Sequence, residues 1–356
     1  MLAPVSDGDQ HNLDQQDGGG PVPGGPVEAR PLLPPATAPD AGLWRNSLAL
    51  LAENLSHWIG RASQRVRHRP PGRADVTAEV RLTEARLARL SALAGQPAFG
   101  GRIALLGMGR HAGLPLLLAW AGASVVVIER FDRRFGRQDQ EAVAEALRQR
   151  YLSPRRRIRQ DYAAAGETGD ETAGDLSIHF GQAAQAVLAA AGPFDVILSD
   201  WALTADAAPL ALLDAMAAAL RPGGVMVHDV PLDAGTLFAG HHPLTFLTPG
   251  EAAWRLMSAA SDRPARLRAP AYGAWLRAAR AGGRLADGEL RVCRIAQTTL
   301  PTPLSLEEAT ALADDDLRAR AAAFVAPVRP RLARPFRGLG DPDLAISHIT
   351  VTARRA

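Results

Sequence analysis

The sequence predicts an α/β protein with a mainly parallel β-sheet and helices on both faces. From about residue 102 onward, short apolar runs alternate with Ala- and Leu-rich stretches of helical spacing, which is typical of parallel strands joined by crossover helices. Apolar residues make up 47% of the 356 residues, enough to bury a large core. The chain is long enough for one decorated α/β domain, which we place at 96–356.

Two segments precede this domain. Residues 1–42 are rich in Gly, Pro, Asp and Gln, so we expect a disordered tail that buries too little apolar surface to offset its ordering entropy. Residues 43–95 should form helices that pack on the core. The first spans Leu43 to about Arg65 and the second about Thr83 to Leu93. A basic amphipathic helix on a membrane surface is the alternative for the first.

Seven strands are expected, with helices between the first five. Long intervals follow strand five and strand six, and such intervals in a compact domain usually hold elements that cover the substrate. We therefore predict a helical insertion or lid at 236–285 and a second insertion at 298–340. The expected strands are Ile103–Leu106, Ser124–Ile128, Leu176–Phe180, Asp195–Ser199, Val225–His228, Leu290–Ala296 and Ala345–Thr352.

Composition narrows the class of partner and the compartment. The one cysteine, Cys293, excludes an internal disulfide framework. The sequence contains no run of 18 apolar residues, so neither a membrane span nor an export signal is predicted. We therefore expect a cytoplasmic protein. All 40 basic residues are Arg and the net charge is only +3, which favours codon bias over nucleic-acid binding. The Arg cluster at 148–159 predicts a solvated helix end or, alternatively, an anionic-ligand surface. The pattern does not predict an oligomeric state.

The segment IALLGMGRHAGLPLLLAWAGASVVVIER predicts a nucleotide-binding unit of strand, Gly-rich turn, helix and strand. Gly107 and Gly109 permit a tight turn and a close approach of the backbone to a ligand, and Gly113 permits close helix packing. Glu129 ends the second strand, where a carboxylate accepts hydrogen bonds from ribose hydroxyls. A dinucleotide remains an alternative ligand, because Gly107-x-Gly109-x-x-Ala112 also fits the dinucleotide fingerprint loosely. Glycines that only serve packing, with a solvated Glu, are a further alternative.

Two later segments resemble class I S-adenosylmethionine-dependent methyltransferases. PFDVILSDWAL (Pro193–Leu203) is similar to their fourth-strand motif, and ALRPGGVMVHDV (Ala219–Val230) resembles their helix, LxPGG turn and fifth strand. The resemblance implies a Rossmann-like seven-stranded sheet whose last strand inserts antiparallel, with S-adenosylmethionine as the cofactor. It also implies cofactor-binding residues, namely Gly107, Gly109, Gly113, Glu129, Gln182 beside the adenine and Asp200 near the crevice.

Three C-terminal segments resemble, in order and spacing, a subgroup associated with polysaccharide and glycan biosynthesis: His241–Ser258, Arg263–Ala279 and Arg334–Arg355. This implies a glycan-precursor or other small-molecule substrate.

Four polar residues are candidates for the substrate side of the site. His228 and His242 are candidate general bases, since imidazole titrates near neutrality, and a structural role is the alternative for each. Arg266 and Arg268 suit phosphate or carboxylate recognition through their donor forks, or a solvated pair. His241 and His242 cannot both face one metal from an extended segment and no third ligand is apparent, so no metal site is predicted.

Several positions depart from the family pattern. Leu105 stands where the resemblance implies an acidic residue, and the stretches 203–205 and 230–235 lack the polar residues that the subgroup carries. Three functions are therefore open. The leading one is methyl transfer to a hydroxyl or carboxylate of a sugar-containing or small polar substrate; the others are a catalytically inactive binding or scaffold protein and a dinucleotide-dependent enzyme.

Overall fold

The computed structural model describes residues 74–94, 101–130, 136–152, 175–233, 241–258, 265–312 and 314–356. The expected tail at 1–42, the first expected helix, residues 153–159 of the Arg cluster and parts of the 236–285 insertion lie outside these ranges.

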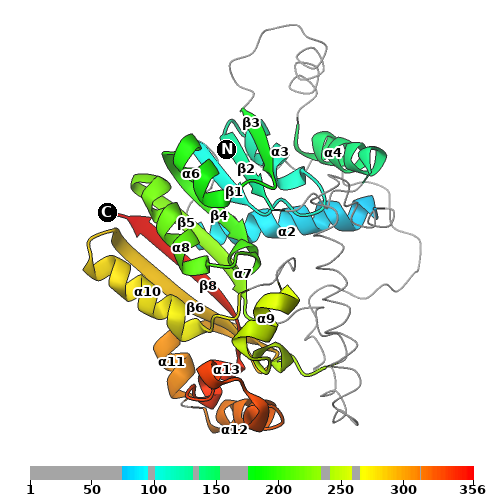
Figure 1. Cartoon of the computed structure of the whole chain (residues 1–356). Helices are drawn as coiled ribbons and strands as arrows, with labels where there is room; N and C mark the ends of the chain where they lie inside the picture. The colour runs from blue at the N-terminus through cyan, green and yellow to red at the C-terminus, as the bar shows by residue number, and fades with distance from the viewer. Residues whose placement is uncertain are drawn as a thin grey trace, which may run out of the picture.

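Eight strands form one mixed sheet in the order β3-β2-β1-β4-β5-β8-β6-β7 (Figure 1). The first five strands in this order are parallel, whereas β8 is antiparallel to both β5 and β6. The antiparallel insertion expected for the last strand is therefore confirmed. The strands are β1 (Arg102–Leu106), β2 (Ser124–Glu129), β3 (Leu176–Phe180), β4 (Phe194–Asp200), β5 (Leu220–Pro231), β6 (Leu285–Ile295), β7 (Thr298–Ser305) and β8 (Ile346–Arg355).

The expectation of seven strands is wrong by one strand, β7, which falls inside the predicted second insertion. Pro301 and Pro303 interrupt its sequence and argue against a strand. Proline is tolerated there because β7 lies at the edge of the sheet and pairs only with β6, so it needs fewer backbone donors. Ala296 and Gln297, with φ of 45° and 63°, join the two strands in a tight hairpin turn.

Helices cover both faces of the sheet, as predicted (Figure 1). The helices α2, α3 and α4 pack on one face, and α6, α8 and α10 pack on the other. The helices are α2 (Val76–Ala94), α3 (Gly113–Trp120), α4 (Arg137–Tyr151), α6 (Ala184–Ala191), α7 (Ala202–Ala205), α8 (Pro209–Ala219), α9 (Glu251–Ser258), α10 (Ala269–Ala281), α11 (Leu306–Ala311), α12 (Asp315–Val325) and α13 (Asp341–Ala345), with short 3₁₀ turns η1 (Thr245–Leu247), η2 (Arg329–Arg331) and η3 (Arg334–Phe336).

The central strands are apolar on both faces, which is why they read as continuous apolar runs. Successive side chains point to opposite sides of a strand. In β1, Leu105 joins the core cluster under α2, α3 and α4, and Leu106 joins the cluster under α6 and α8. Both side chains are almost completely buried.

Helix α2 begins earlier than the Thr83 expected from the sequence. Asp75 precedes it, and its carboxylate accepts a hydrogen bond from the Ala78 amide at 3.1 Å, as an N-cap residue does. Val80, Leu87 and Leu90 are buried against the sheet, so one face of α2 is fixed to the core and the other bears polar residues.

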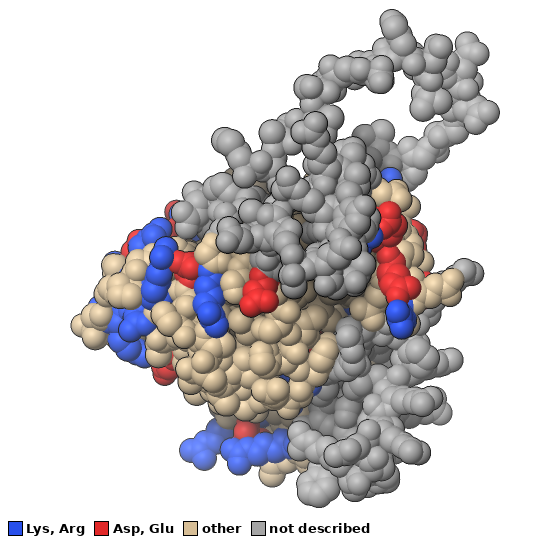
Figure 2. Space-filling model, turned by 90° about the horizontal axis from the view of Figure 1, so that it is seen from above, with Lys and Arg blue, Asp and Glu red and all other residues tan. Residues whose placement is uncertain are grey.

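The predicted insertion between β5 and β6 contains η1, α9 and α10 in its described parts. No helix in the described part of the chain is long and apolar enough to span a membrane. On the face in Figure 2, described acidic and basic side chains are interspersed around a broad uncharged area.

Candidate active site

The loop after β1 lies at the carboxyl ends of the parallel strands, where α/β folds commonly bind ligands. Gly107 and Gly109 both have φ of +87°, a conformation that favours glycine. A Cβ atom on Gly107 would lie 2.9 Å from the Asp200 carbonyl oxygen, so the backbone needs glycine here for space as well. The loop is fastened to β2, because the Met108 amide donates to Glu129 Oε2 at 2.8 Å.

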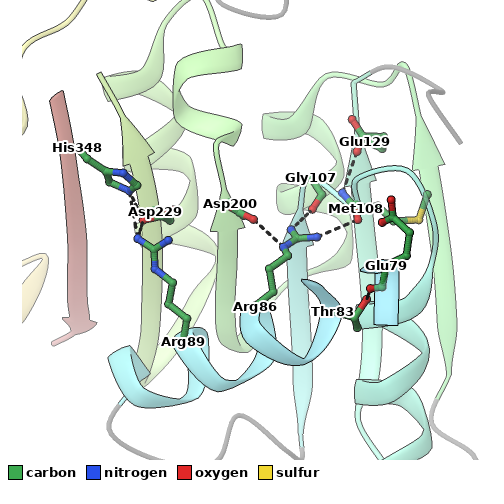
Figure 3. A network of polar contacts seen from close by, with 10 residues as sticks. All are labelled: Glu79, Thr83, Arg86, Arg89, Gly107, Met108, Glu129, Asp200, Asp229 and His348. Carbon is green, nitrogen blue, oxygen red and sulfur yellow. Dashed lines mark hydrogen bonds and ion pairs between the residues drawn. The ribbon is translucent and has the colours of Figure 1, made fainter. Parts of the chain in front are cut away.

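Asp200 stands at the end of β4, on the other side of β1 from Glu129. Its Oδ2 lies 2.6 Å from Nε of Arg86, which projects from α2 (Figure 3). The same guanidinium donates from Nη1 to the Met108 carbonyl at 3.0 Å and from Nη2 to the Gly107 carbonyl at 2.8 Å. Burial raises the pKa of Asp200, and Arg86 opposes this rise by stabilising the carboxylate.

A second polar cluster lies at the end of β5. Asp229 is buried, and its Oδ1 accepts a hydrogen bond from His348 Nε2 at 2.6 Å and another from Arg89 of α2. His348 Nε2 also lies 3.1 Å from Arg89 Nη2. In the tautomer that donates from Nε2 to the carboxylate, Nδ1 is the nitrogen that can accept a proton. Asp229 is the register partner of Asp200 on the adjacent parallel strand, and its charge also raises the pKa of Asp200.

Helix α2 therefore contacts the carboxyl edge at three points along one face, and Figure 3 shows two of them, those of Arg86 and Arg89. Besides Arg86 and Arg89, Glu79 contacts His111 Nε2 at 3.1 Å. His111 Nδ1 in turn accepts from the Gly113 amide at 3.0 Å. Burial lowers the pKa of His111, and Glu79 opposes that change. The spacings of seven and three residues place the three α2 side chains on the same side of the helix.

The structure brings four of the six predicted cofactor residues together, namely Gly107, Gly109, Glu129 and Asp200. Gly113 opens α3, where a Cβ atom would lie 2.7 Å from His111 Nδ1 and 2.9 Å from Leu147 Cδ1 of α4. Its lack of a side chain thus serves the packing of α3 on α4.

Gln182 follows β3, one strand beyond Glu129, and is exposed. The preceding Gly181 amide donates to the Glu129 carbonyl at 2.9 Å, so this end of β3 is anchored next to Glu129.

The two predicted histidines lie away from the polar clusters described above. His228 is fully buried on the opposite face of the sheet, where its Nδ1 lies 2.8 Å from Ser199 Oγ and its Nε2 has no hydrogen-bond partner among the described residues. Burial lowers the pKa of His228 to about 3. The His242 ring packs on Phe324 at 4.6 Å between centroids, and burial lowers its pKa too. These surroundings favour the structural alternative for both.

The two predicted substrate arginines are likewise occupied within the protein, which disfavours their assignment to a substrate. Arg266 donates to Glu251 Oε2 at 2.7 Å and to the Pro249 carbonyl at 2.6 Å. Its guanidinium also lies over the rings of Trp254 and Phe336. The sequence did not predict these two contacts.

Arg268 is buried and donates to three backbone carbonyls, those of Leu232, Leu344 and Ile346. Burial lowers the pKa of Arg268 to about 10. It thus joins the end of β5 to the start of β8. In this structure the two arginines are neither a solvated pair nor surface guanidinium groups available to a phosphate or carboxylate.

Sequence reasoning missed Arg86, Arg89 and His348. The two arginines look like the solvated face of an amphipathic helix, and His348 lies in an otherwise apolar strand. One signal was present for Asp229, since it is a charged residue near the carboxyl end of a buried strand next to the expected crevice.

No known family profile matches the chain, and no curated protein matches it in sequence. Solved structures with a similar fold include the plantazolicin methyltransferase BamL in complex with S-adenosylhomocysteine, at a TM-score of 0.38 and 10% identity, covering 87% of this chain and 96% of that one. A cyclopropane-fatty-acyl-phospholipid synthase-like protein from Lactobacillus casei has a TM-score of 0.39 and 18% identity, with 80% and 94% covered.

The phosphoethanolamine N-methyltransferase 2 of Haemonchus contortus, in complex with S-adenosylmethionine, has a TM-score of 0.36 and 14% identity, with 77% of this chain and 52% of that one covered. At such low similarity the function must be inferred from the residues of the site.

Proposed function

We propose that this protein is an S-adenosylmethionine-dependent methyltransferase that acts on a hydroxyl or carboxylate of a sugar-containing or other small polar substrate. The observation that carries this proposal is the antiparallel strand β8 between β5 and β6, beside five parallel strands. A dinucleotide-binding sheet has six parallel strands in the order 3-2-1-4-5-6 instead. The topology therefore favours the methyl donor over a dinucleotide as the ligand of the Gly-rich loop.

The residues at the end of β1 fit this cofactor. Gly107 and Gly109 adopt the positive φ that the tight turn requires, and the Glu129 carboxylate suits ribose hydroxyls. Gln182 would lie toward the adenine, and the Asp200 carboxylate suits a cationic group on the other side of β1. The bound cofactor supplies an electrophilic methyl group on a sulfonium ion.

The protein's own part in the reaction is to orient the acceptor and to remove its proton. Of the histidines at the carboxyl edge, His111 has both ring nitrogens engaged, by Glu79 and by the Gly113 amide. His348 contacts Asp229 through Nε2, which leaves Nδ1 as its candidate basic nitrogen. We therefore assign the general base to His348. The earlier candidates His228 and His242 stay predictions, which the burial of both rings disfavours.

Calorimetric titration with S-adenosylhomocysteine tests the proposal. We expect the wild type to bind, and Glu129→Gln and Asp200→Asn each to weaken binding by about tenfold, since each removes a charged hydrogen-bonding group. Glu145→Gln is the control, because Glu145 pairs with Arg148 on the surface of α4. Absence of binding by the wild type at millimolar ligand would refute the cofactor assignment.

A second candidate is a protein that keeps this fold for binding alone. The observation that favours it is Leu105, which is fully buried in the core where the resemblance implies an acidic residue. Radiolabelled S-adenosylmethionine, incubated with fractionated glycan precursors and small polar metabolites, separates the two candidates. Ligand binding with no labelled product in any fraction would favour the inactive relative.

A further inference from the structure

Three hydrogen-bond acceptors surround Arg86 at the centre of the candidate site. Two backbone carbonyls, those of Gly107 and Met108, and the Asp200 carboxylate surround its guanidinium at 2.6–3.0 Å (Figure 3). All three partners are oxygens without a hydrogen to donate. The loop and the end of β4 thus form a subsite that accepts a cation.

This subsite matches one end of the proposed cofactor. The methionyl end of S-adenosylmethionine carries a compact ammonium group with three N–H donors, and three acceptors satisfy such a group fully. Asp200 and Glu129 follow the two strands that flank β1, and neighbouring strands lie about 4.8 Å apart. A ligand whose ribose binds at Glu129 therefore has its amino-acid end on the Asp200 side of the loop.

We propose that Arg86 occupies the ammonium subsite of the cofactor pocket in the ligand-free protein and competes with the amino-acid end of the cofactor. This inference rests on the proposed function and concerns the regulation of the same pocket. Occupation by Arg86 lowers the apparent affinity of the cofactor by the fraction of molecules in which the subsite is open.

The side chain of Arg86 can leave the subsite without movement of its helix. Leu87 and Leu90 anchor α2 in the core, whereas the Arg86 side chain is 24% exposed and has several rotatable bonds. Leu82, one turn earlier on α2, is 58% exposed, so the helix is open to solvent on that side. The movement that the proposal requires is a rotamer change that transfers the guanidinium toward solvent.

The test compares two ligands that differ in the amino-acid end. S-adenosylhomocysteine has this end, and 5′-methylthioadenosine has the same nucleoside and sulfur but neither the ammonium nor the carboxylate. We expect Arg86→Met to bind S-adenosylhomocysteine about fivefold to tenfold more tightly than the wild type, within the usual range of such couplings. Its affinity for 5′-methylthioadenosine should stay unchanged. The titrations are made at pH 8, because the raised pKa of Asp200 favours a basic buffer.

Two further variants keep the comparison interpretable. Arg81→Met is the matched control, since Arg81 is an exposed residue of the same helix, and both affinities should equal those of the wild type. Arg86→Met removes three contacts, so its ligand-free melting temperature should fall while its affinity for S-adenosylhomocysteine rises. If this variant does not fold, Arg86→Gln keeps a polar side chain without a cation and should likewise bind S-adenosylhomocysteine more tightly than the wild type.

The outcomes distinguish failure of this inference from failure of the proposed function. Weaker or unchanged binding of S-adenosylhomocysteine by Arg86→Met would overturn the inference, because Arg86 would then support the pocket. Equal tightening for both ligands would also overturn it, since the effect would not concern the amino-acid end of the cofactor. Failure of both ligands to bind the wild type and every variant would refute the proposed function instead.

Discussion

Asp229 and His348 lie 119 positions apart in the sequence and form a 2.6 Å hydrogen bond near the end of β5. The antiparallel pairing of β8 with β5 creates this contact, since it places Pro231 opposite His348 and Asp229 opposite Thr350. A buried carboxylate is stable only when it is paired, and Arg89 is a second partner of the same oxygen, Oδ1. The polar end of β5 thus depends on groups from α2 and β8.

Replacement of Asp229 by Asn should destabilise the fold. His348 and Arg89 would lose a charged acceptor, and we expect the free energy of unfolding in urea to fall by about 2–3 kcal/mol. Asp287→Asn is the control, because Asp287 is exposed and its nearest basic atom, Arg354 Nε, lies 3.7 Å away; its effect should stay below about 0.5 kcal/mol. Similar losses in the two variants would contradict the buried pairing.

Gly107→Ala separates backbone strain from lack of space. A positive φ costs a non-glycine residue about 1–2 kcal/mol, and the new Cβ atom would also lie 2.9 Å from the Asp200 carbonyl oxygen. Gly122→Ala is the matched control, because Gly122 has φ of +100° and no atom within 4 Å of the added Cβ. Denaturant unfolding should show a loss larger by about 1–3 kcal/mol for Gly107→Ala. Equal losses would show that the loop has room.

His228 should make the protein sensitive to acid. Its pKa is about 3 in the fold, against 6.5 as the reference value for the unfolded chain, so the unfolded state binds a proton first as the pH falls. The stability is fully present above pH 6.5 and is lost between pH 6.5 and about 3, by up to about 1.4 kcal/mol per unit. Urea unfolding at several pH values should show a shallower loss for His228→Asn.

The buried state of other groups shapes the same profile. The lowered pKa values of His111 and His242 act in the same direction, whereas the raised pKa of Asp200 acts in the opposite one. Ser177→Ala, at an exposed and non-titrating position on β3, is the control and should keep the slope of the wild type. An unchanged slope in His228→Asn would contradict the assignment to His228.

Arg268→Met tests whether this arginine is structural. Three carbonyls lose their donor at the junction of β5 and β8, and we expect the free energy of unfolding to fall by about 3 kcal/mol. Arg277→Met, on the exposed side of α10, should have little effect. If Arg268→Met unfolds like the wild type, the substrate role predicted from the sequence regains support.

The sequence predicted the parts of the fold that depend on local pattern. The seven expected strands all exist because buried parallel strands form short apolar runs between helices, and the loop glycines are where the turn needs them. β7 escaped prediction because a strand at the edge tolerates two prolines.

The candidate site was predicted only where its residues are close in the sequence to the strand ends. Gly107, Glu129 and Asp200 follow directly from the order of strands in a parallel sheet. Arg86 and His348 reach the same edge through the packing of a helix and of the last strand, which no local pattern reports. Arg266 and Arg268 show the converse, since polar residues that look functional in the sequence satisfy buried backbone and a nearby carboxylate.

The pairing of β4 with β5 sets Ser199 beside His228 and Asp200 beside Asp229, on opposite faces of the sheet. A slip of β5 by one residue would bring the charged Asp229 into the dry core beneath Ser199 and would move the His228 ring toward Arg89. The first move buries a charge, and the second leaves Arg89 without its carboxylate partner. The free-energy cost of this wrong register is therefore far larger than that of a slip between two apolar strands. The polar ends of these strands therefore fix the pairing register of β4 and β5, which the apolar residues around them do not determine.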